Sequence, residues 1–437
     1  LRAVMNMMDS LWADTALPAF PPLEHDAEAD VLIIGGGLAG ILCAYTLTQA
    51  GMDCLLIEAD TICGGISRNT TAKITSQHGL IYGKLERQFG PDTARLYWKT
   101  NEAALRRYRQ LARAFPCDFE EKPAYVYSLD QPETLKAELA ALERLGIPAA
   151  FADHVPLPFP TAGAIRFEEQ AQFHPLKLAA GVARDLHIHE HTAARAFEKN
   201  TVVTDHGRVR AENIIVATHF PLLNKHGGYF LKLYQHRSYV LALEGAMDVR
   251  GMYLDAAENG ISLRNYGPWL LLGGGGHRTG KAGGGWEELE NFARRYFPDS
   301  REKCRWAAQD CMTLDGVPYI GQYGRHTPGL YVATGFNKWG MTSSMTAAMV
   351  LSDLVRGKQN PYAAVFSPTR TVLRPQLLAN LTEATASLLT VSKPRCPHMG
   401  CALKWNPRER TWDCPCHGSR FTETGELLDN PATGGLN

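Results

Sequence analysis

Two cysteines and two histidines near the C-terminal end of the chain have the types and the spacing of metal ligands. Cys396 and His398 form a C-x-H pair, and Cys414 and His417 form a C-x-x-H pair after fifteen intervening residues. Two thiolates and two imidazoles can therefore converge from two loops. Such a set binds either Zn²⁺ in tetrahedral geometry or a [2Fe–2S] cluster in which the cysteines hold one iron and the histidines hold the other.

The surrounding residues favour the iron–sulfur interpretation. The two loops read CPHMGC and CPCHGSRF, so each carries one further cysteine, Cys401 or Cys416. Common zinc spacings are C-x₂-C and H-x₃-H, and these mixed loops fit them poorly. The segment resembles the Rieske iron–sulfur proteins. The resemblance implies a [2Fe–2S] cluster on the four predicted ligands, one-electron transfer as its chemistry, and a Cys401–Cys416 disulfide as in the respiratory and photosynthetic members.

Two residues beside the second loop bear on the reduction potential of such a cluster. By the resemblance, Ser419 stands where the family has a hydroxyl donor to a bridging sulfide. Phe421 stands where the high-potential members have a tyrosine that donates to a cysteine sulfur. Fewer hydrogen bonds to sulfur leave more negative charge on the cluster. We therefore expect a midpoint potential below that of the quinol-oxidising members.

A second motif lies near the start of the chain, between residues 30 and 60. An apolar run meets Gly35, Gly37 and Gly40 in G-x-G-x-x-G spacing, and a second apolar run ends at Glu58. This order predicts a strand, a helix and a second strand. Glycines let a pyrophosphate approach the backbone, the helix N-terminus supplies amide donors, and Glu58 can accept hydrogen bonds from a ribose. The unit therefore predicts a dinucleotide site.

Three further segments favour FAD over NAD. Residues 64–75, 213–219 and 329–342 resemble a loop and two later strands of the D-amino-acid oxidase superfamily of flavoproteins, which includes glycine and sarcosine oxidases. In that superfamily the loop lies against the flavin, and a helix beginning near Met341 would direct its N-terminal amides at the flavin. The resemblance implies FAD, bound by these residues: Gly35, Gly37, Leu38, Ala39, Gly40, Glu58, Ser67, Arg68, Thr71, Gly335, Gly340, Met341 and Thr342.

Candidate catalytic residues follow from the same resemblance. Arg68 and Lys338 fall in loops that reach the flavin, where a cation could stabilise reduced flavin or hold a substrate carboxylate. Cys311 lies in a stretch that loosely resembles the sarcosine oxidase segment whose cysteine carries covalent flavin, but the spacing differs and we expect a buried thiol. The remaining candidates on the substrate side are expected to pack, or in the last case to close the pocket: Tyr239, Tyr266, His277 and Trp339.

No second dinucleotide unit is apparent. The glycine run 273–276 follows an apolar run over 269–272, but no apolar helix follows it. We interpret the run as a turn near the substrate and not as an NADPH site. Electrons are therefore expected to come from a small organic substrate.

Composition excludes several classes of protein. The 437 residues carry 45 basic and 45 acidic side chains, and the basic residues do not cluster with aromatics, so nucleic-acid binding is not expected. No apolar run approaches the length of a membrane span, and the first 30 residues do not resemble a signal peptide. We expect a cytoplasmic protein.

The motifs divide the chain into three domains. An α/β, Rossmann-like FAD-binding domain is expected over 25–85, 155–230 and 325–358. It is interleaved with an α+β substrate domain built on an antiparallel sheet, over 86–154 and 231–324, with helices at 91–114, 132–145 and 287–296. A connector over 359–385 leads to a small all-β Rieske domain over 386–437. Few residues separate the connector from Cys396, so we expect the flavoprotein surface to support the cluster loops.

These features predict an FAD-dependent oxidoreductase. We expect it to oxidise a small organic substrate, first of all a C–N bond of an amine or amino acid, at the flavin. Electrons would then pass singly through the cluster to an external acceptor, a protein or a quinone. Two alternatives stay open at this point: an oxygen-using flavin oxidase or monooxygenase in which the cluster only relays electrons, and a redox-sensing module without turnover.

Overall fold

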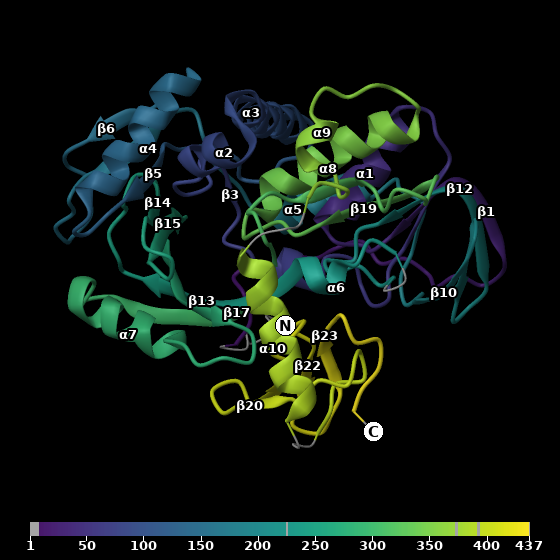
Figure 1. Ribbon diagram of the computed structural model, residues 1–437. Helices are drawn as coiled ribbons and strands as arrows, with labels where there is room; N and C mark the ends of the chain where they lie inside the picture. Colours follow the sequence, from purple (N-terminus) through teal and green to yellow (C-terminus); the bar gives the residue numbers. More distant parts are fainter. Residues whose placement is uncertain (1–7, 224–225, 372–374, 391–393, 437) are drawn as a thin grey trace.

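A computed structural model describes residues 8–223, 226–371, 375–390 and 394–436. Its strands form two large sheets of eight strands each, a four-stranded sheet at the C-terminal end, and a small three-stranded sheet (Figure 1). The two large sheets belong to the flavoprotein part of the chain. The predicted fold class, an α/β domain combined with an antiparallel substrate sheet and a small all-β domain, is confirmed.

The first large sheet is built around β1 (Ala27–Ile34), which pairs in parallel with β2 (Cys54–Ile57) and with β12 (Arg208–Val216). α1 (Leu38–Gln49) connects β1 to β2, so the predicted strand–helix–strand unit is present. All four residues of β2 are buried, as expected for a strand covered on both faces. α1 packs against α8 (Gly340–Val355). The sheet is completed by β9 (Ile188–His189), β10 (Ala194–Glu198), β11 (Thr201–Thr204), β18 (Tyr319–Gln322) and β19 (Leu330–Thr334).

The second large sheet has the order β17-β13-β16-β15-β14-β5-β7-β6 and is antiparallel except where β14 pairs with β5. Its strands are β5 (Ala124–Tyr127), β6 (Ala150–Ala152), β7 (Ala164–Phe167), β13 (Leu233–Glu244), β14 (Met252–Asp255), β15 (Ser262–Tyr266), β16 (Trp269–Arg278) and β17 (Arg301–Thr313). The three predicted helices of this part are present as α3 (Pro91–Ala114), α4 (Pro132–Leu145) and α7 (Gly285–Tyr296). The remaining elements before the C-terminal domain are η1 (Ile66–Asn69), β3 (Lys73–Ile74), α2 (Tyr82–Phe89), β4 (Glu120–Glu121), β8 (Ala171–Gln172), α5 (Pro175–Ala183), α6 (Tyr229–Lys232) and α9 (Ala363–Phe366).

The structure corrects two expectations about this sheet. The glycine run 273–276 does not form a turn but continues β16, where Gly273 and Gly274 pair with β13. A Cβ on Gly273 would lie 2.7 Å from Ser262 Oγ, so a larger residue would force the Ser262 side chain to move. The strand β7 was expected in the FAD-binding domain, but it pairs with β5 in the second sheet.

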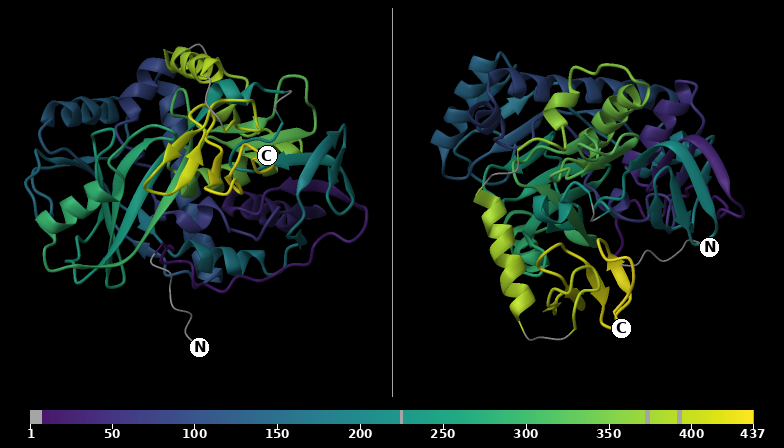
Figure 2. Two further views of the ribbon diagram at one scale, coloured as in Figure 1. Left: turned by 90° about the horizontal axis from the view of Figure 1, so that it is seen from below. Right: turned by 45° about the vertical axis from the view of Figure 1, so that its right-hand side comes forward.

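The C-terminal domain packs below the two large sheets in the view of Figure 1. It consists of the helix α10 (Pro375–Leu389) and the antiparallel strands β20 (Lys404–Asn406), β21 (Thr411–Asp413), β22 (Arg420–Thr422) and β23 (Leu427–Asp429). Figure 2 shows α10 running alongside these strands. All four strands follow the first cluster loop, which is flanked by a single bridge between Arg395 and Ala402.

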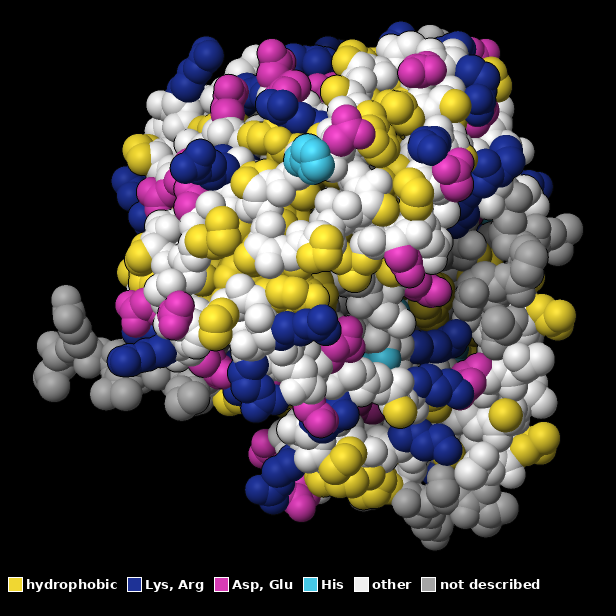
Figure 3. Space-filling view, turned by 90° about the vertical axis from the view of Figure 1, so that its left-hand side faces the viewer, with side chains coloured by type: hydrophobic (Ala, Val, Ile, Leu, Met, Phe, Trp, Pro, Cys, Tyr) yellow, Lys and Arg dark blue, Asp and Glu magenta, His cyan; other side chains and the backbone are white. Residues whose placement is uncertain are grey.

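The surface carries charges of both signs. Basic and acidic side chains are interspersed on the face shown in Figure 3, in keeping with a formal net charge of zero. Within the described residues, every helix is too short or too polar to cross a membrane.

Candidate functional site

A cavity of about 930 Å³ lies where the two large sheets and the C-terminal domain meet. Its size is that of a pocket for a large cofactor together with a small substrate. The first sheet contributes the glycine loop and Glu58, the second sheet contributes Ser238 and Asp310, and α8 contributes its first turn. The C-terminal domain adds Leu427, Leu428, Asp429, Asn430, Ala432 and Thr433. These last residues belong to what we call the 427–433 segment.

The dinucleotide end of the cavity is formed at the start of α1. Gly37 has no side chain to cap this helix, and the N–H of Leu38 donates to Ser67 Oγ at 2.9 Å. Both oxygens of the Glu58 carboxylate accept backbone hydrogen bonds, from Gly36 at 2.6 Å and from Asp60 at 3.0 Å. Burial raises the pKa of Glu58, although these hydrogen bonds oppose the change. The carboxylate is thereby fixed where a ribose hydroxyl could donate to it.

The opposite end is formed by the turn between β19 and α8. Gly335 has a φ of 69°, and a Cβ there would lie 2.3 Å from Thr313 Cγ2. Asn337 and Lys338 also have positive φ values, 51° and 71°. Such a backbone is uncommon for residues with a side chain, although asparagine adopts it more readily than most. The turn places Lys338 on the cavity lining, together with Gly340 and Met341 at the start of α8.

Most of the predicted FAD-binding residues line this cavity: Gly35, Gly37, Leu38, Ala39, Glu58, Ser67, Thr71, Gly335, Gly340 and Met341. Three do not. Gly40 lies behind the loop, where a Cβ would be 1.9 Å from Gly35 O. Thr342 Oγ1 lies 2.9 Å from His78 Nε2. Arg68 is directed outward, with its guanidinium 4.0 Å from the Asp9 carboxylate, so the structure does not place it beside a flavin.

Four polar residues on the cavity wall were not predicted: Lys73, His78, His219 and Asp310. Lys73 in β3 and His78 are close in the chain, but only the tertiary fold brings them together with His219 and with Asp310 of β17. Lys73 Nζ donates to Tyr253 O at 3.2 Å, and burial together with Arg264 lowers its pKa to about 7. His78 is stacked on Trp339 with ring centroids 4.5 Å apart, and burial lowers its pKa to about 3. Lys73 and His219 fall inside two of the segments that resemble the flavoproteins, 64–75 and 213–219, and this was the available signal.

Two charged residues of the wall, Asp310 and Lys338, influence one another electrostatically. Asp310 Oδ2 accepts from Ser238 Oγ at 3.4 Å, and burial raises the pKa of Asp310 while Lys338 opposes the change. Burial lowers the pKa of Lys338, and here Asp310 and Glu258 oppose the change. The cavity lining therefore includes a cation, Lys338, that interacts with the carboxylates of Asp310 and Glu258.

The four predicted cluster ligands lie in two adjoining loops. Cys396 is hydrogen-bonded to Cys414, and the His398 and His417 rings are 4.9 Å apart between centroids at 89°. Burial lowers the pKa of both histidines to about 4, so the imidazoles are neutral at pH 7, as metal ligands must be. His417 Nδ1 is buried and has no hydrogen-bond partner among the described residues. A buried acceptor of this kind fits a bond to iron.

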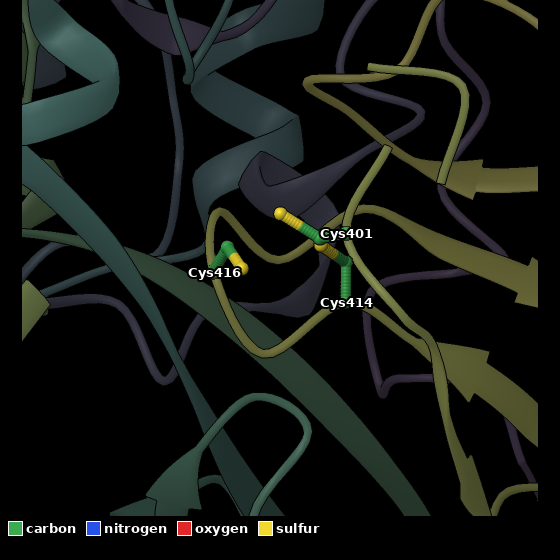
Figure 4. A group of neighbouring side chains, drawn as sticks. All are labelled: Cys401, Cys414 and Cys416. Atoms are coloured by element: carbon green, nitrogen blue, oxygen red, sulfur yellow. The ribbon is translucent and has the colours of Figure 1, made fainter. Parts of the chain in front are cut away.

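The two additional cysteines lie beside this site. The sulfur atoms of Cys401, Cys414 and Cys416 are all within 4.8 Å of one another, and Figure 4 shows the three side chains converging. Cys401 and Cys416 are free thiols in this structure, so the predicted disulfide stays a prediction. Ser419 is fully buried and hydrogen-bonded to Cys396, and Phe421 is fully buried in the same cluster of side chains.

The cluster loops pack directly on the cavity wall. His219 Nε2 lies 3.2 Å from Gln235 Oε1, and a Cβ on Gly418 would lie 2.2 Å from Gln235 Cγ. Gly418 follows His417 in the chain, and its carbonyl accepts from Gln309 Nε2 at 2.8 Å. The flavoprotein surface thus supports the cluster loops, as expected from the short segment between the connector and Cys396.

Comparison with known proteins identifies both parts of the chain. The model of the FAD dependent oxidoreductase (DAO) family matches residues 30–354, and the Rieske [2Fe-2S] domain model matches residues 366–437. The chain belongs to the DAO family. Its C-terminal part is a Rieske domain, whose matched range begins before α10 and so includes most of the expected connector. The cofactors of this DAO protein are FAD and a [2Fe–2S] cluster, and the residues described above fit both.

Individual relatives agree with this assignment. YhfW of Bacillus subtilis (strain 168), named as a Rieske 2Fe-2S iron–sulfur protein, is 33% identical over 97% of this chain and 96% of its own length. Gamma-glutamylputrescine oxidoreductase of Escherichia coli (strain K12) is 24% identical, covering 79% of this chain and 88% of that protein. The crystal structure of glycine oxidase from Geobacillus kaustophilus has a TM-score of 0.66 at 20% identity and covers 79% of this chain and 100% of that one. This DAO protein is therefore an FAD-dependent oxidoreductase enzyme with a Rieske domain.

Proposed function

We propose that the enzyme oxidises the C–N bond of a small amine or amino acid and passes the electrons singly through the Rieske cluster to an external acceptor, a protein or a quinone. One observation carries the proposal. Gln235 contacts both His219 on the cavity wall and Gly418 beside the ligand His417, so the two cofactor sites share a wall. When bound, a flavin can accept two electrons from a C–N bond, and a Rieske cluster carries one electron at a time.

The choice of an amine is supported by the charges of the cavity and by the relatives. Asp310 and Glu258 both line the cavity, and carboxylates there would attract a substrate ammonium. Lys338 interacts electrostatically with both of these carboxylates, and its ammonium group would attract a carboxylate of the same substrate. The E. coli relative is named for an amine, gamma-glutamylputrescine. A substrate with a protonated amine, with or without a carboxylate, fits these groups.

Asp310 is the residue best placed to handle a proton. An ammonium group must lose a proton before its neighbouring C–H bond can give up two electrons, because the nitrogen lone pair stabilises the developing cation. Asp310 lies on the cavity wall, is partly buried, and has a pKa raised by burial. A carboxylate whose pKa lies closer to neutrality is a better general base. We assign Asp310 this role, and we assign Lys338 the role of holding negative charge in the cavity.

Anaerobic mixing tests the function. The FAD- and iron-loaded enzyme is mixed with a panel of amines and amino acids, while flavin absorbance and then the electron paramagnetic signal of reduced Rieske cluster are followed. The expected result is bleaching of the flavin by at least one compound, followed by the cluster signal. Flavin reduction without any cluster signal would contradict the electron path, and rapid hydrogen peroxide formation in air would favour an oxidase.

Asp310→Asn tests the proton-handling role. Flavin reduction is expected to slow about 100-fold, the lower end of the range for general-base catalysis. The pH dependence at low pH, where Asp310 becomes protonated, is also expected to disappear. Glu244→Gln, an exposed acid at the end of β13, is the matched control and should behave like the wild type. An unchanged pH profile in Asp310→Asn would show that another group takes the proton.

A further inference from the structure

The 427–433 segment connects the two cofactor sites physically. At one end, the N–H of Ala432 donates to Ser419 Oγ at 3.0 Å, and Ser419 is itself hydrogen-bonded to the cluster ligand Cys396. At the other end, six residues of the segment line the cavity that also contains Gly37 and Glu58. The Rieske domain therefore supplies part of the wall around the FAD site.

Asn430 attaches the segment to the FAD-binding sheet. Its Nδ2 donates to Thr218 O at 2.6 Å, and Thr218 lies on the cavity lining just after β12. The preceding residue, Ala217, donates its N–H to Ile34 O at 2.8 Å. A Cβ on Gly35 would lie 2.6 Å from Ala217 O, so this backbone touches the glycine loop. Asn430 thus bonds to the residue that follows Ala217, and Ala217 contacts the glycine loop of the predicted pyrophosphate site.

The charge of the segment is compatible with an anionic cofactor. Asp429 is its one acidic residue, and its carboxylate lies 2.9 Å from Arg420 and 3.9 Å from Arg237. Both guanidinium groups are almost completely buried, so solvent screens these interactions little. These attractions partly offset the charge of Asp429, although the same two guanidinium groups also pair with Glu409 and Asp413. A carboxylate on this wall without such partners would weaken the binding of a dinucleotide.

We infer that the Rieske domain completes the FAD-binding site: the 427–433 segment, held on Thr218 by Asn430 and on the cluster shell by Ser419, closes the cavity and slows FAD release. The inference rests on the FAD site of the proposed function but requires no knowledge of the substrate. The 427–433 segment is therefore expected to be held more tightly in the FAD-loaded protein than in the apoprotein. The coupling is reciprocal, because a segment that holds FAD is held by FAD in turn.

The experiment measures FAD binding directly, through the quenching of flavin fluorescence on titration of the apoprotein. Asn430→Ala is expected to weaken FAD binding about fivefold, the loss of one typical hydrogen bond. Asn291→Ala, which changes an exposed residue of α7, is the matched control and should stay within twofold of the wild type. Cluster content, from visible absorption and the electron paramagnetic signal, should be unchanged in both. Unchanged FAD affinity in Asn430→Ala with an intact cluster would overturn the inference.

Hydrogen exchange on the unmodified chain provides a second measurement in case Asn430→Ala does not fold. Addition of FAD to the apoprotein is expected to slow backbone amide exchange at least threefold in the 427–433 segment. The turn at 423–426, in the same domain but absent from the cavity lining, is the internal control and should not change. Equal exchange in the segment with and without FAD would refute the inference. Neither measurement uses turnover, so a failure of the proposed reaction would leave both results interpretable.

Discussion

Replacing Glu409 with glutamine is expected to loosen the attachment of the Rieske domain. Glu409 lies in the C-terminal domain and is paired with Arg237 of β13 and, at 2.7 Å, with Arg420. Tyr239 Oη also donates to it, at 2.9 Å. The side chain of Glu409 is 9% exposed and that of Arg237 is 4% exposed, so these charges are almost fully withdrawn from water.

The size of the effect follows from the pKa of Glu409. Burial opposes its ionisation, but attraction by Arg237 and Arg420, with hydrogen bonds from Arg237 and Tyr239, lowers the pKa from 4.5 to about 2. At about 1.4 kcal/mol per pKa unit this difference corresponds to about 3 kcal/mol, in line with the cost of removing one partner from a buried ion pair. Because the folded pKa is depressed, this stability is present above pH 4.5 and is lost as the pH falls toward 2.

Thermal unfolding followed by visible circular dichroism of the cluster measures the loss. If all 437 residues unfold together, with an entropy of about 0.9 kcal/mol/K, then 3 kcal/mol lowers Tm by about 3 °C. If the Rieske domain unfolds first on its own, its unfolding entropy is smaller and the same free energy lowers its Tm by more. Glu423→Gln removes the exposed partner of Arg410 and is the control, with an expected change below about 1 kcal/mol. A Glu409→Gln variant as stable as the control at pH 7, or one that keeps the wild-type decline below pH 4.5, would refute the reasoning.

Three further predictions concern the cofactor sites. Phe421→Tyr is expected to raise the midpoint potential of the cluster, since it adds a hydroxyl donor inside the buried shell; a redox titration without change would remove the argument. Gly40→Ala is expected to abolish FAD retention on gel filtration, because its Cβ would lie 1.9 Å from Gly35 O, whereas Gly434→Ala meets nothing within 4 Å and should bind normally. Acid precipitation is expected to leave all yellow colour in the supernatant, and colour in the pellet would indicate flavin bound to Cys311.

Local sequence patterns predicted the parts of the fold that depend on neighbouring residues. The helices at 91–114 and 132–145 both begin with proline, and the second ends before Gly146 in the left-handed conformation. The glycine run of β16 was misassigned because its reason is not local. Its small residues accommodate Ser262 and Ile261 of the neighbouring chain segment, and the sequence alone does not show that these lie alongside.

The same distinction applies to the candidate site. The glycine loop and the cluster ligands are contiguous motifs, so their chemistry is visible in the sequence. Asp310 and His219 are single polar residues in separate segments, and only the packing of the two large sheets brings both to the cavity wall. Arg68 shows the converse. Its position in the flavin loop was foreseen, but its side chain is directed toward Asp9, a contact that depends on a distant part of the chain.

Charge burial explains why the two parts of the chain form one unit. Arg237 is a residue of the flavoprotein sheet, yet its ion-pair partners among the described residues, Glu409 and Asp429, both belong to the Rieske domain. A buried guanidinium without a carboxylate costs several kcal/mol, so Glu409 and Asp429 offset the cost of burying Arg237 beneath the Rieske domain. The same contact fixes Gly418 on Gln235, beside the cavity wall. The ion pairs that hold the domains together therefore also hold the cluster loops at one distance from the FAD site.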